Sequence, residues 1–111
     1  MIIAVPVKGG LLSQHFGHCE SFRLFHTDKD KNILRNEDLT PPPHEPGVLP
    51  KWLAEQKANV IITGGMGMHA QQLFAQNGIE VVLGAPAGDP LCIAEEWLKG
   101  SLESGANPCD H

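Results

Sequence analysis

Apolar residues fall into short runs along the chain, and the longest of these runs have the length and composition of strands. Three runs, at residues 2–7, 59–63 and 79–83, are rich in Ile and Val, which is typical of buried strands. Two further segments, 22–25 and 33–37, flank a polar stretch of Asp, Lys and Asn. That pattern predicts a β-hairpin with a solvated turn.

Segments with the apolar spacing of helices lie before, between and after the second and third of the Ile- and Val-rich runs. Two of them span residues 48–57 and 68–77, and a third helix is expected to open at Asp89 as cap and Pro90 as first residue. Gly78 is suited to end the second helix in the left-handed conformation. The chain therefore alternates strand and helix after the hairpin.

This order of elements predicts an α/β fold with a mixed sheet and helices on both of its faces. Right-handed crossovers make the strands at 2–7, 59–63 and 79–83 parallel. Ligands of such sheets bind beyond the carboxyl ends of the parallel strands. We therefore expect the three loops that follow these strands to meet at one edge of the sheet.

Length and charge restrict the class of protein. A chain of 111 residues suits one domain, 1–111, with 101–111 expected to form a mobile tail. The net charge is −5 and only eight Lys and Arg are spread along the chain, which argues against nucleic acid as a partner. No apolar run has the length of a membrane span and the first residues lack the pattern of a signal peptide, so we expect a cytoplasmic protein. Three cysteines, an odd number, argue against a disulfide framework.

The loop after the first strand concentrates residues that bind metals. His15, His18 and Cys19 lie within five positions, so a single loop can present all three side chains. Imidazole and thiolate are the usual donors to zinc, copper, iron and iron–sulfur species. The spacing matches no standard zinc motif, and a His that caps a strand beside a small buried Cys explains the same residues. Both interpretations stay open at this point.

The loop after the second parallel strand is rich in glycine and methionine. Gly64, Gly65, Met66, Gly67 and Met68 follow a strand and open a helix, so backbone amides and the helix dipole would attract an anion there. The thioethers could line an apolar pocket for a sulfur-rich anion, although methionines at this spacing are more often core. The Gly-Lys-Ser/Thr of a nucleotide-binding loop is absent.

The end of the chain and the remaining cysteines offer weaker signals. Cys109, Asp110 and His111 could contact a metal or close over a site, or they could be a frayed end. Cys92, inside the last predicted helix, is expected to pack in the hydrophobic core of the protein. No nucleophile elbow or paired-carboxylate motif is present, which argues against an enzyme, and a hydrolase with Cys19 as nucleophile is the less favoured alternative.

Four segments together, 13–19, 46–53, 61–67 and 107–111, resemble the dinitrogenase iron–molybdenum cofactor biosynthesis family, in particular its small stand-alone members that are similar to nitrogenase accessory factors. The resemblance implies a ribonuclease-H-like, three-layer α/β/α fold around a mixed five-stranded sheet, with three parallel strands plus one hairpin. It also implies a non-catalytic protein that binds, carries or protects an iron–sulfur or molybdenum-containing cluster during cofactor assembly or delivery.

The resemblance also implies which residues form the site and what the partners are. The metal ligands would be His15, His18, Cys19, Cys109 and His111, and the further contacts to the cluster would come from Gly64, Gly65, Met66 and Gly67. We expect Ser13 and Met68, next to these residues, to contact the cluster as well. Three cysteines cannot complete a four-thiolate cubane in one chain, so binding would need mixed ligands, a second subunit or non-covalent capture. The expected partner is a protein that donates or accepts the cluster, and the chain is expected to be a monomer or weak homodimer. A simple zinc or copper module is the alternative.

Overall fold

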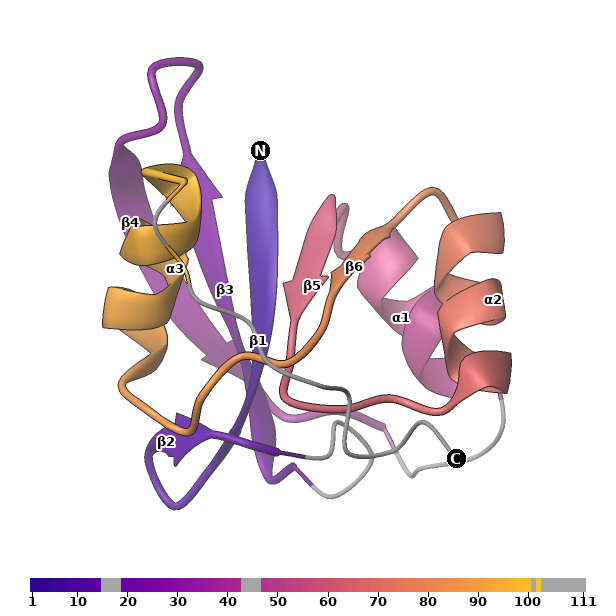
Figure 1. Ribbon diagram of the computed structural model, residues 1–111. Helices are drawn as coiled ribbons and strands as arrows, with labels where there is room; N and C mark the ends of the chain where they lie inside the picture. Colours follow the sequence, from indigo (N-terminus) through magenta and orange to yellow (C-terminus); the bar gives the residue numbers. More distant parts are fainter. Residues whose placement is uncertain (15–18, 43–46, 101, 103–111) are drawn as a thin grey trace.

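The computed structural model describes residues 1–14, 19–42, 47–100 and 102, and in this part of the chain one sheet and three helices are formed (Figure 1). The strands are β1 (Ile2–Lys8), β2 (Leu11–Leu12), β3 (Ser21–Thr27), β4 (Ile33–Leu39), β5 (Val60–Ile62) and β6 (Glu80–Val82). The helices are α1 (Val48–Glu55), α2 (Met68–Gln76) and α3 (Pro90–Leu98).

The sheet is mixed, as the order of elements predicted. Its strands run in the order β4-β3-β1-β5-β6, and β2 pairs with β1. β1, β5 and β6 are parallel neighbours, whereas β3 and β4 form an antiparallel hairpin on the other side of β1. The predicted three parallel strands and one hairpin are therefore confirmed.

The predicted number of five strands is wrong, because the described residues form six. The additional strand, β2, is antiparallel to the end of β1, with Leu12 opposite Val7. Gly9 and Gly10 have φ of +62° and +81°, and this left-handed pair turns the chain back at once. A strand of only two residues has no apolar alternation that a sequence pattern could reveal.

Two hydrophobic clusters lie on opposite faces of the sheet. The side chains of β1 alternate between them: Ile3 and Val5 belong to the cluster that includes α3, and Ala4 belongs to the cluster that includes α1 and α2. Figure 1 accordingly shows α3 separated from the other two helices by the sheet. This alternation is the ordinary period of a strand that is covered on both faces. Because helices cover both faces of a sheet that contains parallel strands, the protein is of the α/β class.

The first helix ends earlier than the sequence pattern predicted. α1 stops at Glu55, two residues before the predicted end at Lys57, which has a left-handed φ of +65°. The N–H of Ala58 then bonds back to the carbonyl of Leu53 at 3.0 Å, which closes the helix. A lysine in this conformation cannot be recognised from sequence. The left-handed cap expected at Gly78 is present, with φ of +75°.

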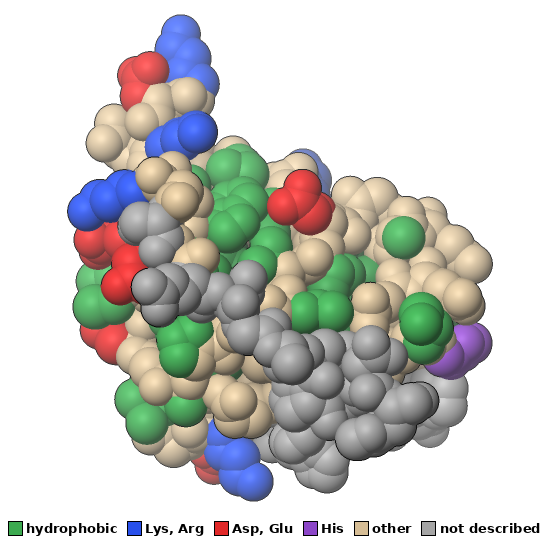
Figure 2. Space-filling view, in the orientation of Figure 1, with side chains coloured by type: hydrophobic (Ala, Val, Ile, Leu, Met, Phe, Trp, Pro, Cys, Tyr) green, Lys and Arg blue, Asp and Glu red, His purple; other side chains and the backbone are tan. Residues whose placement is uncertain are grey.

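Charged side chains of both signs are interspersed where β4 and α3 form the side of the molecule, so no basic patch forms on that side (Figure 2). Such a patch is what binding to a nucleic acid backbone requires. The described helices are also too short or too polar to cross a bilayer.

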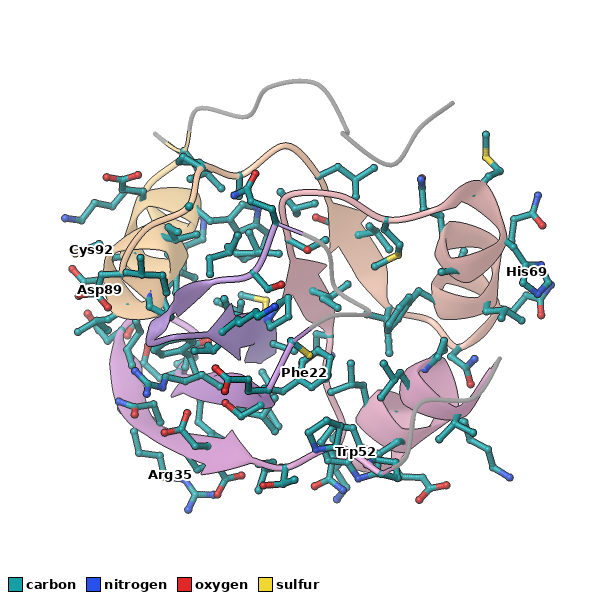
Figure 3. All side chains as sticks on the ribbon, turned by 90° about the horizontal axis from the view of Figure 1, so that it is seen from below. Phe22, Arg35, Trp52, His69, Asp89 and Cys92 are labelled. Carbon is teal, nitrogen blue, oxygen red and sulfur yellow. The ribbon has the colours of Figure 1, made fainter. Side chains whose placement is uncertain are left out.

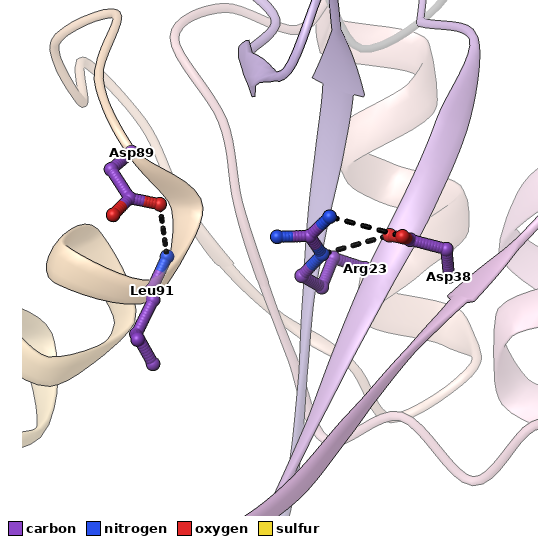
Figure 4. A network of polar contacts seen from close by, with 4 residues as sticks. All are labelled: Arg23, Asp38, Asp89 and Leu91. Carbon is purple, nitrogen blue, oxygen red and sulfur yellow. Dashed lines mark hydrogen bonds and ion pairs between the residues drawn. The ribbon is translucent and has the colours of Figure 1, made fainter.

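The start of α3 follows the predicted capping pattern, and it supports a test of stability. The carboxylate of Asp89 accepts a hydrogen bond from the N–H of Leu91 at 3.2 Å, and Pro90 occupies the first turn (Figure 4). Asp89→Ala removes this cap and is expected to lower the free energy of unfolding by about 1 kcal/mol in urea titrations. Asp89→Asn is the matched control, because asparagine caps equally well, and equal losses in both variants would show that capping is not the cause.

Candidate functional site at the carboxyl edge of the parallel strands

The loops that follow β1, β5 and β6 meet at one edge of the sheet. The hydroxyl of Thr63, after β5, donates to the carbonyl of Ser13 at 3.4 Å. The side-chain amide of Gln14 donates to the carbonyl of Ala85, after β6, at 3.5 Å. The N–H of Ala85 in turn bonds to the carbonyl of Thr63 at 3.2 Å. The predicted meeting of these loops is therefore present in the described residues.

Gly64 is where the first and second loops pack most closely. A Cβ at position 64 would lie 2.8 Å from both Cα and O of Gln14, and 3.0 Å from its Oε1. Two of these atoms belong to the backbone, so they cannot swing aside as the end of a flexible side chain can. Only glycine fits at this approach without moving one of the loops.

The first loop is fixed to the end of β1 on both of its sides. On one side the N–H of Ser13 bonds to the carbonyl of Pro6, and on the other the N–H of Glu20 bonds to the carbonyl of Val7, each at 2.8 Å. The carboxylate of Glu20 also accepts from the N–H of Gly9 at 2.6 Å. Residues 14 and 19 are therefore held at the same edge of the sheet. His15 and His18, between them, lie outside the described residues.

Cys19 is the predicted ligand that the structure describes in the first loop. It is half-buried and packs against the cluster that includes α1 and α2. Burial raises the pKa of the Cys19 thiol to about 11, against a smaller lowering by a backbone hydrogen bond. The free thiol is therefore protonated at neutral pH, which is unfavourable for a nucleophile and leaves a ligand that must lose a proton on binding a metal.

The second loop divides its side chains between core and solvent. Met66 is fully buried in the same cluster as Phe74, and its carbonyl accepts from the side-chain amide of Gln71 at 2.9 Å. The side chain of Met68 is 60 % exposed at the start of α2. The side chain of Met66 therefore packs in the hydrophobic core, which was the more common interpretation of its spacing. Gly64 allows the two loops to pack closely together.

The described residues do not assemble a metal centre by themselves. Nowhere among them do three His, Cys, Asp or Glu side chains come close enough to hold one ion. His26, on β3, lies 3.4 Å from the carboxylate of Glu37, and His69 is exposed on α2 (Figure 3). The predicted ligands Cys109 and His111 lie outside the described residues.

The expectation that Cys92 packs in the core is wrong. Cys92 is exposed on α3, and its thiol donates to the carboxylate of Asp89 at 3.5 Å (Figure 3). The buried face of α3 is formed by Pro90, Ile93, Ala94 and Leu98, so position 92 falls outside that face. By contrast, the loops are joined by Gln14, Thr63 and Ala85, to which the sequence pattern assigned no role, although Gln14 and Thr63 lie inside the motif segments 13–19 and 61–67.

A hollow of about 530 Å³ lies away from this edge. Lys31 and Lys99 line it together with Leu98, between the β3–β4 turn and the end of α3. The turn is at the amino end of β1, because Thr27 bonds to the carbonyl of Met1. The hollow is therefore separate from the edge where the loops meet.

The fold is thus that of an α/β protein with three interlocked loops at the carboxyl ends of its parallel strands. The family model for dinitrogenase iron-molybdenum cofactor proteins matches residues 1–100, and the chain belongs to that family.

Relatives extend over nearly the whole chain. The uncharacterized protein MJ0580 of Methanocaldococcus jannaschii is 31 % identical over 107 residues, which is 93 % of this chain and 90 % of that protein. The crystal structure of PH0822 superposes with a TM-score of 0.86 at 26 % identity and covers 94 % of each chain. The apo form of the orange protein from Desulfovibrio gigas superposes with a TM-score of 0.76 at 25 % identity and covers 96 % of this chain and 94 % of that one.

Proposed function

We propose that this protein holds a metal–sulfur cluster, of iron–sulfur or molybdenum-containing type, against the carboxyl edge of its parallel strands. The cluster is cargo, which the protein carries or protects during cofactor assembly, and the protein catalyses no reaction on it. The partner is a protein that donates or accepts the cluster, and the setting is the cytoplasm. We also propose that the fold is a three-layer arrangement of the ribonuclease-H-like type.

The observation that carries the proposal is the packing of the first loop on the second. Gln14 rests directly on Gly64 and reaches Ala85, so all three loops are held as one unit. Cys19, at the other end of the first loop, is anchored beside the same edge through its neighbour Glu20. The family to which the chain belongs, and its likeness to a protein known in an apo form, point to a bound group of this kind.

The start of α2 supplies the features that favour an anion. Gly67 precedes the helix and contributes no side-chain acceptor to its first turn. Helix amides with no side-chain partner, together with the helix dipole, favour negative charge at this position. An anionic sulfide cluster would then need few direct ligands, of which Cys19 is the described one and His15 and His18 are the neighbouring candidates. Few ligands suit a carrier, because release stays easy.

The proposal predicts that cluster binding depends on the first loop. Protein purified without oxygen is expected to take up an added iron–sulfur or molybdenum–sulfur cluster in stoichiometric amount, measured by visible absorption. Replacing Cys19 by Ser and His15 by Ala together should reduce the binding at least about tenfold, the usual scale for losing ligands of a metal site. Cys92→Ser is the matched control, because Cys92 is the exposed cysteine on α3, and it should bind as the wild type does.

Two results would contradict the proposal. Unchanged binding by the doubly substituted protein would place the cluster elsewhere. Elemental analysis that finds one zinc or copper ion and no inorganic sulfide, in protein from its own host, would show a simple metal-binding module instead.

A further inference from the structure

β4 forms one end of the sheet, and its outer edge is a long strand edge. The strand has seven residues and pairs only with β3 among the described elements. The opposite end of the sheet is β6, which has only three residues. A long edge strand offers its backbone N–H and C=O groups for pairing with another chain.

The registers of the sheet show which backbone groups of β4 face outward. The N–H of Asn59 bonds to the carbonyl of Ile2, so Ile2 turns its backbone groups away from β3. Opposite Ile2 lies His26, whose groups then turn toward β4, and opposite His26 lies Arg35. Arg35 therefore bonds to β3, and the next residue, Asn36, turns its N–H and C=O outward. Because the alternation has period two, Asp38 turns outward as well.

Charge selects one register for an antiparallel pair of two β4 strands. Symmetric registers centred on residues 35, 36 and 37 bring outward-facing groups opposite each other and keep most of the strand paired. One places Arg35 opposite its own copy, and another does the same with Glu37, so each sets like charges face to face. In the third, Asn36 lies opposite Asn36 of the partner subunit, and Arg35 lies opposite the partner's Glu37. Opposite charges in directly facing positions stabilise strand pairs.

We propose that two copies of this chain associate by antiparallel pairing of their β4 strands, centred on Asn36. The two sheets then join into one, and each copy contributes the same surface, as a two-fold dimer requires. Arg35 pairs with the partner's Glu37 on both sides of the centre. This interface lies on the hairpin, away from the loops of the proposed cluster site, so it is independent of that function.

The ends of β4 are less regular than its centre. Ile33 and Leu39 are both partly buried, but they pack against clusters on opposite faces of the sheet, and the pairing with β3 shifts between Ile33 and Arg35. Leu34 has a side chain that is 66 % exposed, and it lies opposite the partner's Asp38. Asp38 is already paired within its own chain, because the guanidinium of Arg23 donates to its two oxygens at 2.8 and 3.0 Å (Figure 4). Arg35, at the outside of the strand in Figure 3, is the basic group left for a partner to use.

The test is the association state of the full chain as a function of concentration. Sedimentation is expected to show a monomer–dimer equilibrium of the wild type between about 10 μM and about 1 mM. Arg35→Glu and Glu37→Arg should each weaken association about tenfold, because each places like charges opposite one another twice per dimer. Lys51→Glu is the control for Arg35→Glu, since it makes the same change of charge at an exposed position of α1.

Mixing the two variants gives the decisive measurement. One variant carries two acids at these positions and the other carries two bases, so an equimolar mixture should form a mixed dimer at least as well as the wild type. Combining both substitutions in one chain should restore self-association for the same reason. A wild type that stays monomeric throughout, or a dimer that Arg35→Glu leaves unchanged, would overturn the proposal, and so would a mixture that associates no better than either variant alone.

Discussion

Gly64→Ala is expected to lower the free energy of unfolding by about 2 kcal/mol and the melting temperature by roughly 10 °C, as overpacking at a closed contact does in a domain of this size. The added Cβ would lie 2.8 Å from the backbone of Gln14, so the first loop must move away from β5. Since that loop carries Cys19, the same variant should lose most of its affinity for a metal–sulfur cluster. Thermal unfolding and cluster titration of the same preparation measure both effects.

Gly67→Ala is the matched control for this prediction. A Cβ at position 67 would meet nothing within 4 Å, and the backbone there is extended with φ of −66°, which alanine adopts without strain. We expect its stability to stay within about 0.5 kcal/mol of the wild type. If both glycine variants lost the same stability, the close approach of residues 14 and 64 would not be what holds the loops together. If Gly64→Ala were destabilised yet bound the cluster normally, the site would not depend on this contact.

The main strands, and the parallel direction of three of them, could be predicted from the sequence because burial imposes a clear pattern on them. Residues 3–5 and 60–62 are buried in unbroken runs, as expected of strands in a sheet that is covered on both faces. The features that were missed are local and leave no such pattern. β2 has two residues, and the end of α1 depends on the left-handed conformation of Lys57. Neither can be recognised from the spacing of apolar residues.

The candidate site could be predicted only in part, for a related reason. The edge at which the loops meet follows from strand direction, and Gly64 lies in a glycine run that stands out in any sequence. The role of each side chain depends on three-dimensional packing: Met66 turned out to be core, whereas Gln14 became the link to Ala85. Cys92 shows the same limit, since its neighbour Ile93 is buried while Cys92 is exposed. A step of one residue, about 100° around the helix, decides such a difference.

Cys19 is expected to react with iodoacetamide about a hundredfold more slowly at pH 8 than an ordinary thiol. Its pKa is about 11 rather than 9.0, because burial disfavours the thiolate, and only the thiolate reacts. The rate should rise with pH and reach half of its maximum near pH 11, and unfolding in urea should restore the ordinary rate. Mass spectrometry of the alkylated peptides separates Cys19 from the exposed Cys92. Alkylation of folded Cys19 at the ordinary rate would contradict the burial of its thiol. It would favour the alternative that Cys19 is the nucleophile of a hydrolase.

The same pKa predicts how stability and cluster binding vary with pH. A thiol whose pKa is raised on folding stabilises the native state fully below its unfolded pKa, near 9.0, and this contribution is lost as pH rises toward about 11. The wild type should therefore lose more stability than Cys19→Ala between pH 8.5 and 11, measured by urea unfolding. Coordination of a cluster by Cys19 must instead remove the proton at neutral pH, so binding should release a proton and tighten as pH rises. Binding that is independent of pH between 6 and 8.5 in the wild type would mean that Cys19 stays protonated and that the cluster is held by other groups at this edge.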